Sequence, residues 1–333
     1  MTTQLHDGLA AVLRAMAAHD TSGLPLAPDA RFTENGQVLR IGDGLWGTLT
    51  RYAGDGGEPF EKLNAYRIDF VDPAAQQAVF FGATVENNTP GMMMLRVKFS
   101  GTKIAEIEAV AVREEIVGEH GGTVTMFQPR LLLPFEPRGF RAPAPELIAK
   151  ASARHSVSEL TAVVDAFFDA IEKDDPARVA FTEECVVRNN GLLAANDPDA
   201  PPLDAEVPAY RPFALSFTEQ IATGFTRYTS RIRQRRHVAV DPERGLVLSV
   251  AVFDHAARVR EIDVPGIGKV TFPGYIPGIE EERIAALPGS KLFPNLQVPT
   301  SDLYAQLIRV EGGRIAYVEA ICRGAPYGLS TGW

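Results

Sequence analysis

The chain has 333 residues, of which 45% are hydrophobic and 23% charged, and its formal net charge at pH 7 is −9. This length suits two ordinary domains, each with its own core, and the composition is that of a globular protein. The negative charge disfavours binding to a phosphate backbone, so we expect no nucleic-acid partner. No apolar run approaches the roughly 18 residues that suggest a transmembrane helix, so we expect no membrane partner.

The N-terminal residues and the cysteines are typical of a reducing compartment. Residues 1–7 lack the basic region and the following apolar region of a signal peptide. Cys185 and Cys322 are the only cysteines, too few for a disulfide framework or for a metal cluster of their own. The six histidines show no metal-ligand spacing, and no cofactor-binding motif appears. We therefore expect a cytoplasmic protein with neither a metal nor a cofactor.

The first part of the chain is predicted to be a helix followed by antiparallel strands. Leu9, Val12, Leu13 and Met16 recur at helical spacing and predict a helix over residues 8–19. The strands come in two pairs joined by tight turns, and pairs joined in this way are antiparallel. The expected strands are residues 63–72, 77–86, 92–99 and 103–113.

The second part repeats this order after a proline-rich linker, residues 131–150. A helix is expected over residues 157–173, followed by strands at residues 227–240, 244–255, 303–310 and 314–323. The predicted domains are therefore residues 1–130 and 151–333. The second domain carries a long insertion at about residues 256–299, which we expect to be a packed lid because long loops often serve as lids.

Matching segments indicate that the two parts are copies of one unit. Residues 29–36 align with residues 184–191 at an offset of 155, and residues 101–109 align with residues 312–320 at an offset of 211. Between them, a Val-Asp-Pro turn recurs at an offset of 169. The offsets only rise, so the second copy keeps the order of the first and gains insertions of 14 and 42 residues. One copy can therefore serve as a control for the other.

The order of elements resembles the nuclear transport factor 2-like superfamily, which includes SnoaL-like and ketosteroid-isomerase-like enzymes. The resemblance rests on Phe167–Asp175, Val186–Gly191 and the Gly-Gly-Arg-Ile hairpin within Arg309–Glu319, with their counterparts in the first copy. It covers most of both halves, apart from the linker and the insertion. It implies an α+β fold of two tandem cones, each a curved antiparallel sheet wrapped around N-terminal helices, with an apolar pocket at the wide end. It fixes no function, because this superfamily includes isomerases, dehydratases, lyases and binding domains.

The two copies differ where one face of a strand turns from apolar to polar. Side chains alternate across a strand, and the apolar face should point into the cone. At positions where the first copy is apolar, the second copy has Arg235, His237, Tyr304 and Gln306. Because buried polar groups are costly unless they are satisfied, four of them on one inner face predict a ligand site.

Four residues are candidates for catalysis: His237, Tyr304, Arg235 and Asp254. His237 suits a general acid or base, Tyr304 a hydrogen-bond donor, and Arg235 the stabilisation of an oxyanion. Asp254 can orient a histidine or act as the base. The alternative is a structural or surface role for His237, and an outward, ion-paired role for Arg235 within the arginine-rich stretch 227–236. A register shift of one residue would exchange the two faces.

Five residues are candidates for substrate binding: Gln306, Asn190, Tyr275, Tyr327 and Trp333. Asn190 equally suits a left-handed turn with the glycine that follows it. Tyr275 lies in the insertion. Tyr327 and Trp333 lie in a tail that we expect to fold back onto the body, at the pocket mouth or at a subunit contact.

The functional hypothesis is a cofactor-independent enzyme with its pocket in the second copy. It would be a lyase, dehydratase or isomerase that transfers protons on a small apolar or aromatic metabolite. The alternative is a non-catalytic module of the same fold that binds a small molecule or assembles proteins. We expect a small-molecule partner, and a homodimer is left open.

Overall fold

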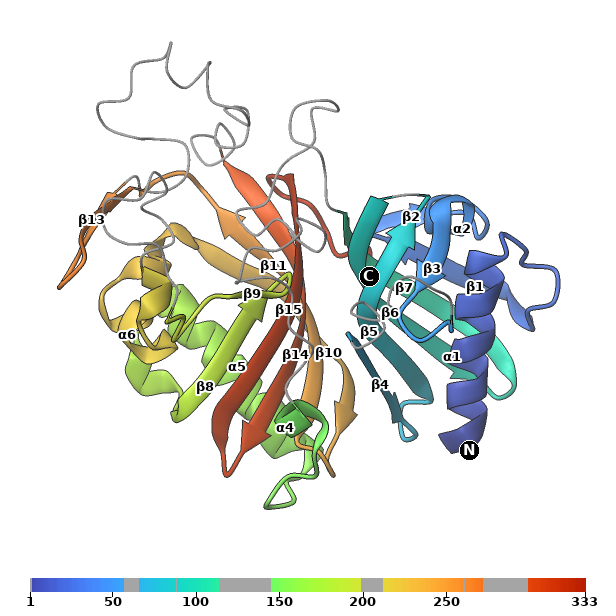
Figure 1. The fold of residues 1–333 in the computed structure, drawn as a ribbon, viewed down its shortest axis with the longest axis horizontal. Helices are drawn as coiled ribbons and strands as arrows, with labels where there is room; N and C mark the ends of the chain where they lie inside the picture. The colour runs from blue at the N-terminus through green and yellow to red at the C-terminus, as the bar shows by residue number, and fades with distance from the viewer. Residues whose placement is uncertain are drawn as a thin grey trace, which may run out of the picture.

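The computed structural model describes residues 2–56, 66–87, 89–113, 145–198, 212–259, 261–271 and 299–333. The fold is α+β, with mostly strands, few helices and curved sheets (Figure 1). Two large sheets account for most of the strands, one in each half of the chain. In the parts of the chain that are described, no helix is both long and apolar enough to cross a membrane.

The first sheet is covered by α1 (Thr2–Ala17), whose buried stripe of Leu5, Leu9, Val12, Leu13 and Met16 packs into the core. The strand order is β2-β1-β7-β6-β5-β3, and β4 also pairs with β5. The elements are β1 (Leu26–Glu34), β2 (Gln37–Leu39), α2 (Leu45–Thr48), β3 (Leu49–Tyr52), β4 (Arg67–Asp72), β5 (Gln77–Glu86), β6 (Thr89–Ser100) and β7 (Lys103–Arg113).

The second sheet has the strand order β10-β11-β14-β15-β8-β9 and is covered by α5 (Val157–Lys173). A capping box between Ser156 and Glu159 starts α5, and Asp174 ends it in the left-handed conformation. The remaining elements are α4 (Pro145–Ile148), η1 (Pro176–Arg178), β8 (Phe181–Asn189), β9 (Leu192–Leu193), α6 (Phe217–Ala222), η3 (Phe225–Tyr228), β10 (Arg231–Asp241), β11 (Leu246–His255), β12 (Glu261–Val264), β13 (Gly268–Thr271), β14 (Thr300–Glu311) and β15 (Arg314–Pro326).

The two sheets have the same strand order when the second is read in reverse, with β10 in the place of β4. They also share their register. Phe32 pairs with Ile107 between the parallel strands β1 and β7, and Val187 pairs with Val318 between the parallel strands β8 and β15. These pairs are related by the same offsets of 155 and 211 residues that relate the two copies in the sequence. The sequence offsets therefore correspond to equivalent places in the two sheets.

Most of the expected elements lie where the sequence predicts them. The expected bounds of α5, β5 and β7 are those of the structure. β10 starts at Arg231 rather than at residue 227, because the chain first makes the 3-10 turn Phe225–Tyr228. Within the expected lid, β12 and β13 form a hairpin that buries Ile262 and Val264 against the core of the second half. Residues 272–298 of this insertion lie outside the described residues.

The sheets pack against each other through the faces that point away from α1 and α5 (Figure 1). Leu248, Leu307 and Ile321 of the second sheet belong to the same apolar cluster as the core of the first half. Val318 and Cys322 alternate with these residues and pack into a separate cluster on the α5 side. Each sheet therefore buries both faces, which explains the continuous burial along β5 and β11.

Two buried glutamates lie at equivalent positions between the sheets. Glu108 of β7 binds Arg96 Nε at 2.8 Å and also accepts a hydrogen bond from Arg236 of the other half. Glu319 of β15 is fully buried and accepts hydrogen bonds from the hydroxyls of Tyr66, in the first half, and Tyr317. Both carboxylates therefore link the two halves of the chain.

The C-terminal tail also joins the two halves. The Trp333 indole Nε1 donates to Thr33 Oγ1 at 2.9 Å, and the guanidinium groups of Arg31 and Arg96 lie 4.4 and 5.0 Å from the centre of the Trp333 ring. Arg233 of the second sheet donates to the Leu329 carbonyl. The tail thus folds back onto the body, as expected, and Trp333 packs on the first sheet.

Glu319 gives stability a specific pH dependence. Burial raises the pKa of Glu319 from an ordinary 4.5 to about 7, against the opposing effects of Arg188 and the two tyrosine hydroxyls. Between these values the folded chain holds a proton that the unfolded chain has lost, so the free energy of unfolding should fall as pH rises, by roughly 3 kcal/mol. In Glu319→Gln this fall should disappear, as measured by urea unfolding at pH values of about 5 and about 7.5.

The matched control is Glu108→Gln, at the equivalent position of the first sheet. This variant should be destabilised, because Arg96 and Arg236 lose their carboxylate, but it should keep the wild-type fall with pH. Identical pH slopes for wild type and Glu319→Gln would contradict the prediction.

Candidate functional site

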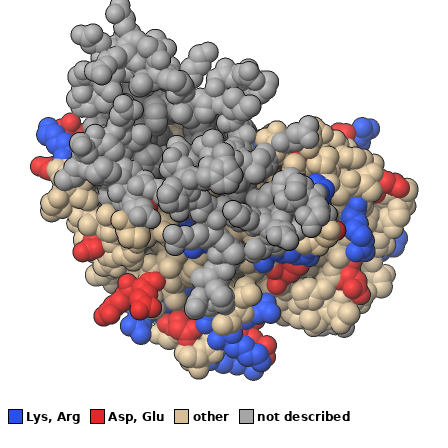
Figure 2. All heavy atoms as spheres, viewed as in Figure 1, with Lys and Arg blue, Asp and Glu red and all other residues tan. Residues whose placement is uncertain are grey.

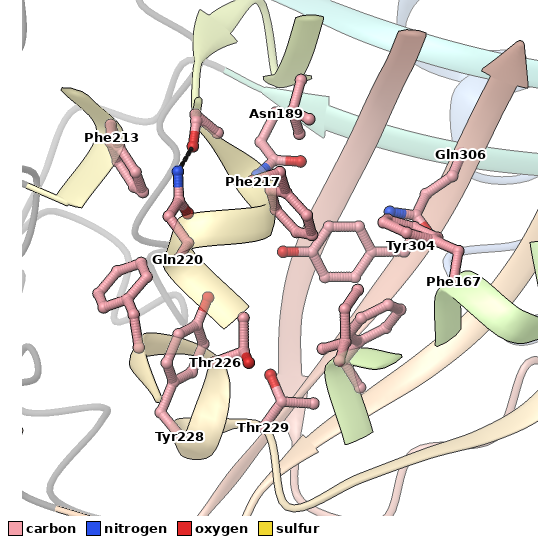
Figure 3. Close-up of a pocket in the computed structure, with 15 residues that line it drawn as sticks. Phe167, Asn189, Phe213, Phe217, Gln220, Thr226, Tyr228, Thr229, Tyr304 and Gln306 are labelled. Atoms are coloured by element: carbon pink, nitrogen blue, oxygen red, sulfur yellow. Dashed lines mark hydrogen bonds between the residues drawn. The ribbon is translucent and has the colours of Figure 1, made fainter. Parts of the chain in front are cut away.

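A cavity of about 40 Å³ lies in the second half, between α5 and the sheet (Figure 3). A cavity of this size holds a few waters. Its wall comes from α5, β8, α6, η3, β11 and β14, so the sheet, the helix and the chain that follows β9 meet there. The residues that line it are Phe167, Ile171, Val187, Asn189, Ala194, Phe213, Phe217, Gln220, Phe225, Thr226, Tyr228, Thr229, Phe253, Tyr304 and Gln306.

Local contacts fix the segment that closes one side of the cavity. A capping box between Ser216 and Glu219 starts α6. From this helix the buried Gln220 donates its amide to the Ala194 carbonyl at 2.7 Å, the dashed line in Figure 3, and to the Leu215 carbonyl at 3.2 Å. The amide nitrogen of Gln220 is therefore fully used in holding the wall together.

Gln306 is the polar group of the wall that is left unsatisfied. Its side chain is 4% exposed, and its Oε1 is buried without a hydrogen-bond partner. A buried acceptor of this kind costs about 1–3 kcal/mol relative to a satisfied one. The aligned residue of the first copy is Leu95, which has no such group. Oε1 is thus a buried acceptor that no donor of the described protein satisfies.

Two tyrosines add hydroxyl groups that stay protonated. The Tyr304 hydroxyl points toward the middle of the lining side chains in Figure 3 and shares a hydrogen bond with the Cys322 thiol. Burial, reinforced by nearby Cys322 and Asp302, raises the pKa of Tyr304 well above its ordinary value. Burial also raises the pKa of Tyr228. Both side chains therefore act as neutral hydrogen-bonding groups near neutral pH.

A histidine–aspartate pair lies behind Tyr228. His255 Nε2 is 3.0 Å from Asp302 Oδ2, and His255 Nδ1 is 3.2 Å from the Tyr228 carbonyl oxygen. Each of these two oxygens can accept a hydrogen bond from the imidazole ring. The Tyr228 ring stacks on the imidazole with the ring centres 5.2 Å apart. The pair is connected to the cavity wall through Tyr228.

Sequence reasoning missed this pair and selected Asp254 instead. Asp254 faces the opposite side of the sheet, because Phe253 takes the cavity side and side chains alternate along β11. There it binds Arg233 at 2.7 Å and Ser301 at 2.6 Å. The prediction that Asp254 joins the pocket is therefore corrected. Strand alternation could have identified the pair, because His255 lies two positions after Phe253 and therefore on the same face of β11.

Of the four inward-facing polar residues, the cavity brings together Tyr304 and Gln306. His237 and Arg235 lie toward α5 but do not line the cavity. His237 is held by Ser249 at 2.8 Å and by Asp165 of α5 at 3.2 Å. Arg235 pairs with two carboxylates of the same helix, Asp169 at 2.6 Å and Glu172 at 3.0 Å. These acidic groups of α5 satisfy both side chains away from the cavity.

The other substrate-binding candidates lie elsewhere. Asn190 is in the left-handed conformation and binds the backbone of Cys322 through both side-chain atoms, at 2.9 and 3.0 Å, so it holds a turn and does not line this cavity. Tyr327 is 51% exposed, and Trp333 packs on the first sheet. Neither residue lines this cavity, and the alternative of a subunit contact stays a prediction. Tyr275 lies outside the described residues.

The arginine-rich stretch is largely ion-paired. Arg227 binds Asp174 at 2.5 Å, while Arg233, Arg235 and Arg236 bind the carboxylates named above. On the face shown in Figure 2, acidic and basic side chains are interspersed. These contacts agree with the alternative interpretation of the stretch 227–236, in which its arginines pair with carboxylates. Within the described ranges, no group of three or more His, Cys, Asp or Glu side chains is arranged to hold a metal ion.

A family described as a domain of unknown function, DUF8021, matches residues 153–322. The chain belongs to this family. No curated protein and no solved structure was found to match the chain. The DUF8021 match runs from just before α5 to near the end of β15, so it includes every residue named above as lining the cavity.

Replacement of Gln306 by leucine tests whether its amide is unsatisfied. Gln306→Leu removes the orphaned acceptor and introduces the side chain that the first copy has at this position. The free energy of unfolding, measured with urea and no added ligand, should stay the same or rise by up to about 2 kcal/mol.

Gln220→Leu is the control, because the Gln220 amide bonds two carbonyls. That variant should lose about 1–3 kcal/mol. A loss for Gln306→Leu as large as that for Gln220→Leu would mean that the Gln306 amide is paired.

Proposed function

We propose that the second half of the chain binds a small molecule in the cavity between α5 and the sheet. The observation that carries the proposal is the buried, unpaired Oε1 of Gln306 in the cavity wall. An unsatisfied buried acceptor calls for an explanation, and a bound molecule that donates to it is one. The wall is otherwise mostly apolar, with a few hydrogen-bonding groups, which is the usual composition of a ligand site.

The size of the cavity sets limits on the ligand. At about 40 Å³ it accepts only a molecule of few non-hydrogen atoms as it stands. A larger aromatic metabolite requires the side chains of Phe213, Phe217 or Tyr228 to move. The chain between Ala194 and Phe213, which both line the cavity, includes residues 199–211, which lie outside the described residues.

The proposed kinship is with the nuclear transport factor 2-like superfamily, as two tandem cones. It is supported by the shared strand order and register of the two sheets and by the position of α1 and α5 on their outer faces. In this proposal the second cone keeps an open pocket, while the first is filled by apolar side chains at the positions of Tyr304 and Gln306. Met93 and Leu95, both fully buried, are those side chains.

The binding proposal predicts ligands that stabilise the wild type through the cavity. A thermal-shift screen with small amines, alcohols, amides, carboxylic acids and aromatic metabolites should yield a compound that raises the melting temperature in proportion to its affinity. The shift should be lost in Gln306→Leu and reduced in Tyr304→Phe. Tyr52→Phe, in the first half, is the control and should respond as the wild type does. If every variant responds alike, the compound binds elsewhere and the proposal fails.

A second candidate function is catalysis, which the His255–Asp302 pair favours. This buried pair stacks on Tyr228, on the sheet face that also carries Tyr304. The neutral Tyr304 hydroxyl lines the cavity and can supply a proton to a substrate, and the His255–Asp302 pair behind Tyr228 supplies a further acid–base group, as a cofactor-independent lyase, dehydratase or isomerase requires. The pair, rather than His237, is the acid–base group that we assign to this reaction.

The catalytic candidate predicts chemical change of any ligand that the screen finds. Wild type should convert the compound, with the product detected by NMR or mass spectrometry, while Asp302→Asn and Tyr304→Phe should bind it with turnover reduced by about 100-fold or more. His237→Gln should retain turnover, because Ser249 and Asp165 hold that ring away from the cavity. If the compound binds and no product forms, the catalytic candidate fails and the non-catalytic binding function remains.

A further inference from the structure

The cavity wall is dominated by aromatic rings. Nearly half of its residues are aromatic, and several are in mutual contact, including Phe253 and Tyr304 with ring centres 4.4 Å apart and Phe167 and Phe217 with ring centres 5.6 Å apart. The faces of aromatic rings carry negative potential and attract cations. The aromatic residues of the wall are Phe167, Phe213, Phe217, Phe225, Tyr228, Phe253 and Tyr304.

One polar group of the wall lacks a partner, because Gln306 Oε1 is unpaired. Two of its polar neighbours already use their donors within the protein. The Gln220 amide donates to the carbonyls of Ala194 and Leu215, and Thr226 Oγ1 donates to Asp174 Oδ1 at 2.6 Å. A molecule that satisfies Gln306 Oε1 must therefore bring a hydrogen-bond donor of its own.

An anionic ligand has no counter-charge in this wall. Among the described residues that line the cavity, none is Lys, Arg or His, and none is Asp or Glu, so the aromatic faces are what favours a cation over an anion here. The charged groups behind the wall are already paired, Asp174 with Arg227 and Asp302 with His255. The net charge of the chain, −9, favours the approach of a cation over that of an anion.

We propose that the ligand is a small organic ammonium ion, bound with an N–H group directed at Gln306 Oε1 and with its alkyl groups against the aromatic rings. This inference rests on the proposed binding function and names the ligand class of the same site. Moving an ammonium group out of water is costly, and the aromatic faces together with the amide carbonyl offset this cost. The cavity volume restricts the ion to a protonated amine with few carbons.

The test compares three probes of similar size and different charge: dimethylammonium chloride, 2-propanol and sodium acetate. Their binding to the wild type is measured by ligand-observed NMR titration at constant ionic strength. Dimethylammonium should bind about tenfold or more tightly than 2-propanol, and acetate should not bind. Gln306→Leu should weaken dimethylammonium binding by about tenfold or more, because a hydrogen bond to a charged group is lost.

A pair of phenylalanine variants tests the role of the rings. Phe217 lines the cavity, whereas Phe181 stacks on Phe217, with ring centres 5.6 Å apart, and lies outside the wall. Phe217→Leu should weaken dimethylammonium binding several-fold and leave 2-propanol binding unchanged, while Phe181→Leu should change neither. The Gln306→Leu result stands without this pair if either variant folds poorly.

Three results would overturn the inference. Equal affinities for dimethylammonium and 2-propanol would show a donor site without preference for charge, which leaves the proposed binding function intact. Preferential binding of acetate would show an anion site. If none of the three probes binds, the ammonium assignment fails, and the wider ligand screen decides separately whether the cavity binds a small molecule.

Discussion

The burial of two equivalent carboxylates between the sheets is the constraint on which the rest of the structure depends. Glu108 and Glu319 each need partners, and each draws one from the opposite half of the chain: Arg236 for Glu108 and Tyr66 for Glu319. These contacts fix how the sheets lie against each other. Those faces are therefore filled by side chains of the two halves where the described sheets meet. The cavity lies on a helix-covered face, beneath α5.

The two copies have diverged on that helix-covered face. The first copy fills it with apolar side chains and gains core stability. The second places Gln306 and Tyr304 there and leaves one acceptor unpaired, an arrangement that lowers stability unless a ligand completes it. The preserved backbone and the changed side chains thus separate what the fold requires from what function requires. This contrast is the physical basis for assigning the site to the second half.

Much of the fold and part of the site can be predicted from the sequence. Apolar periodicity and the repeat locate the strands, and strand alternation places Tyr304 and Gln306 on the inner face. The same parity places His237 toward α5, but the carboxylate that holds it there, Asp165, belongs to a helix whose approach depends on tertiary packing. The contact between His255 and Asp302 arises only when β11 pairs with β14, across an insertion that carries no pairing signal. The homodimer and the cytoplasmic location stay predictions.

The most direct test of the account is a crystal structure of the protein as purified, at a resolution that shows ordered water. The account predicts electron density in the cavity, from a small molecule or a water that donates to Gln306 Oε1, with its partner within about 3 Å. A Gln306 amide bonded instead to a protein group, in a cavity that its own side chains fill, would contradict the central claim. In that case the polar residues of the second sheet would serve packing alone.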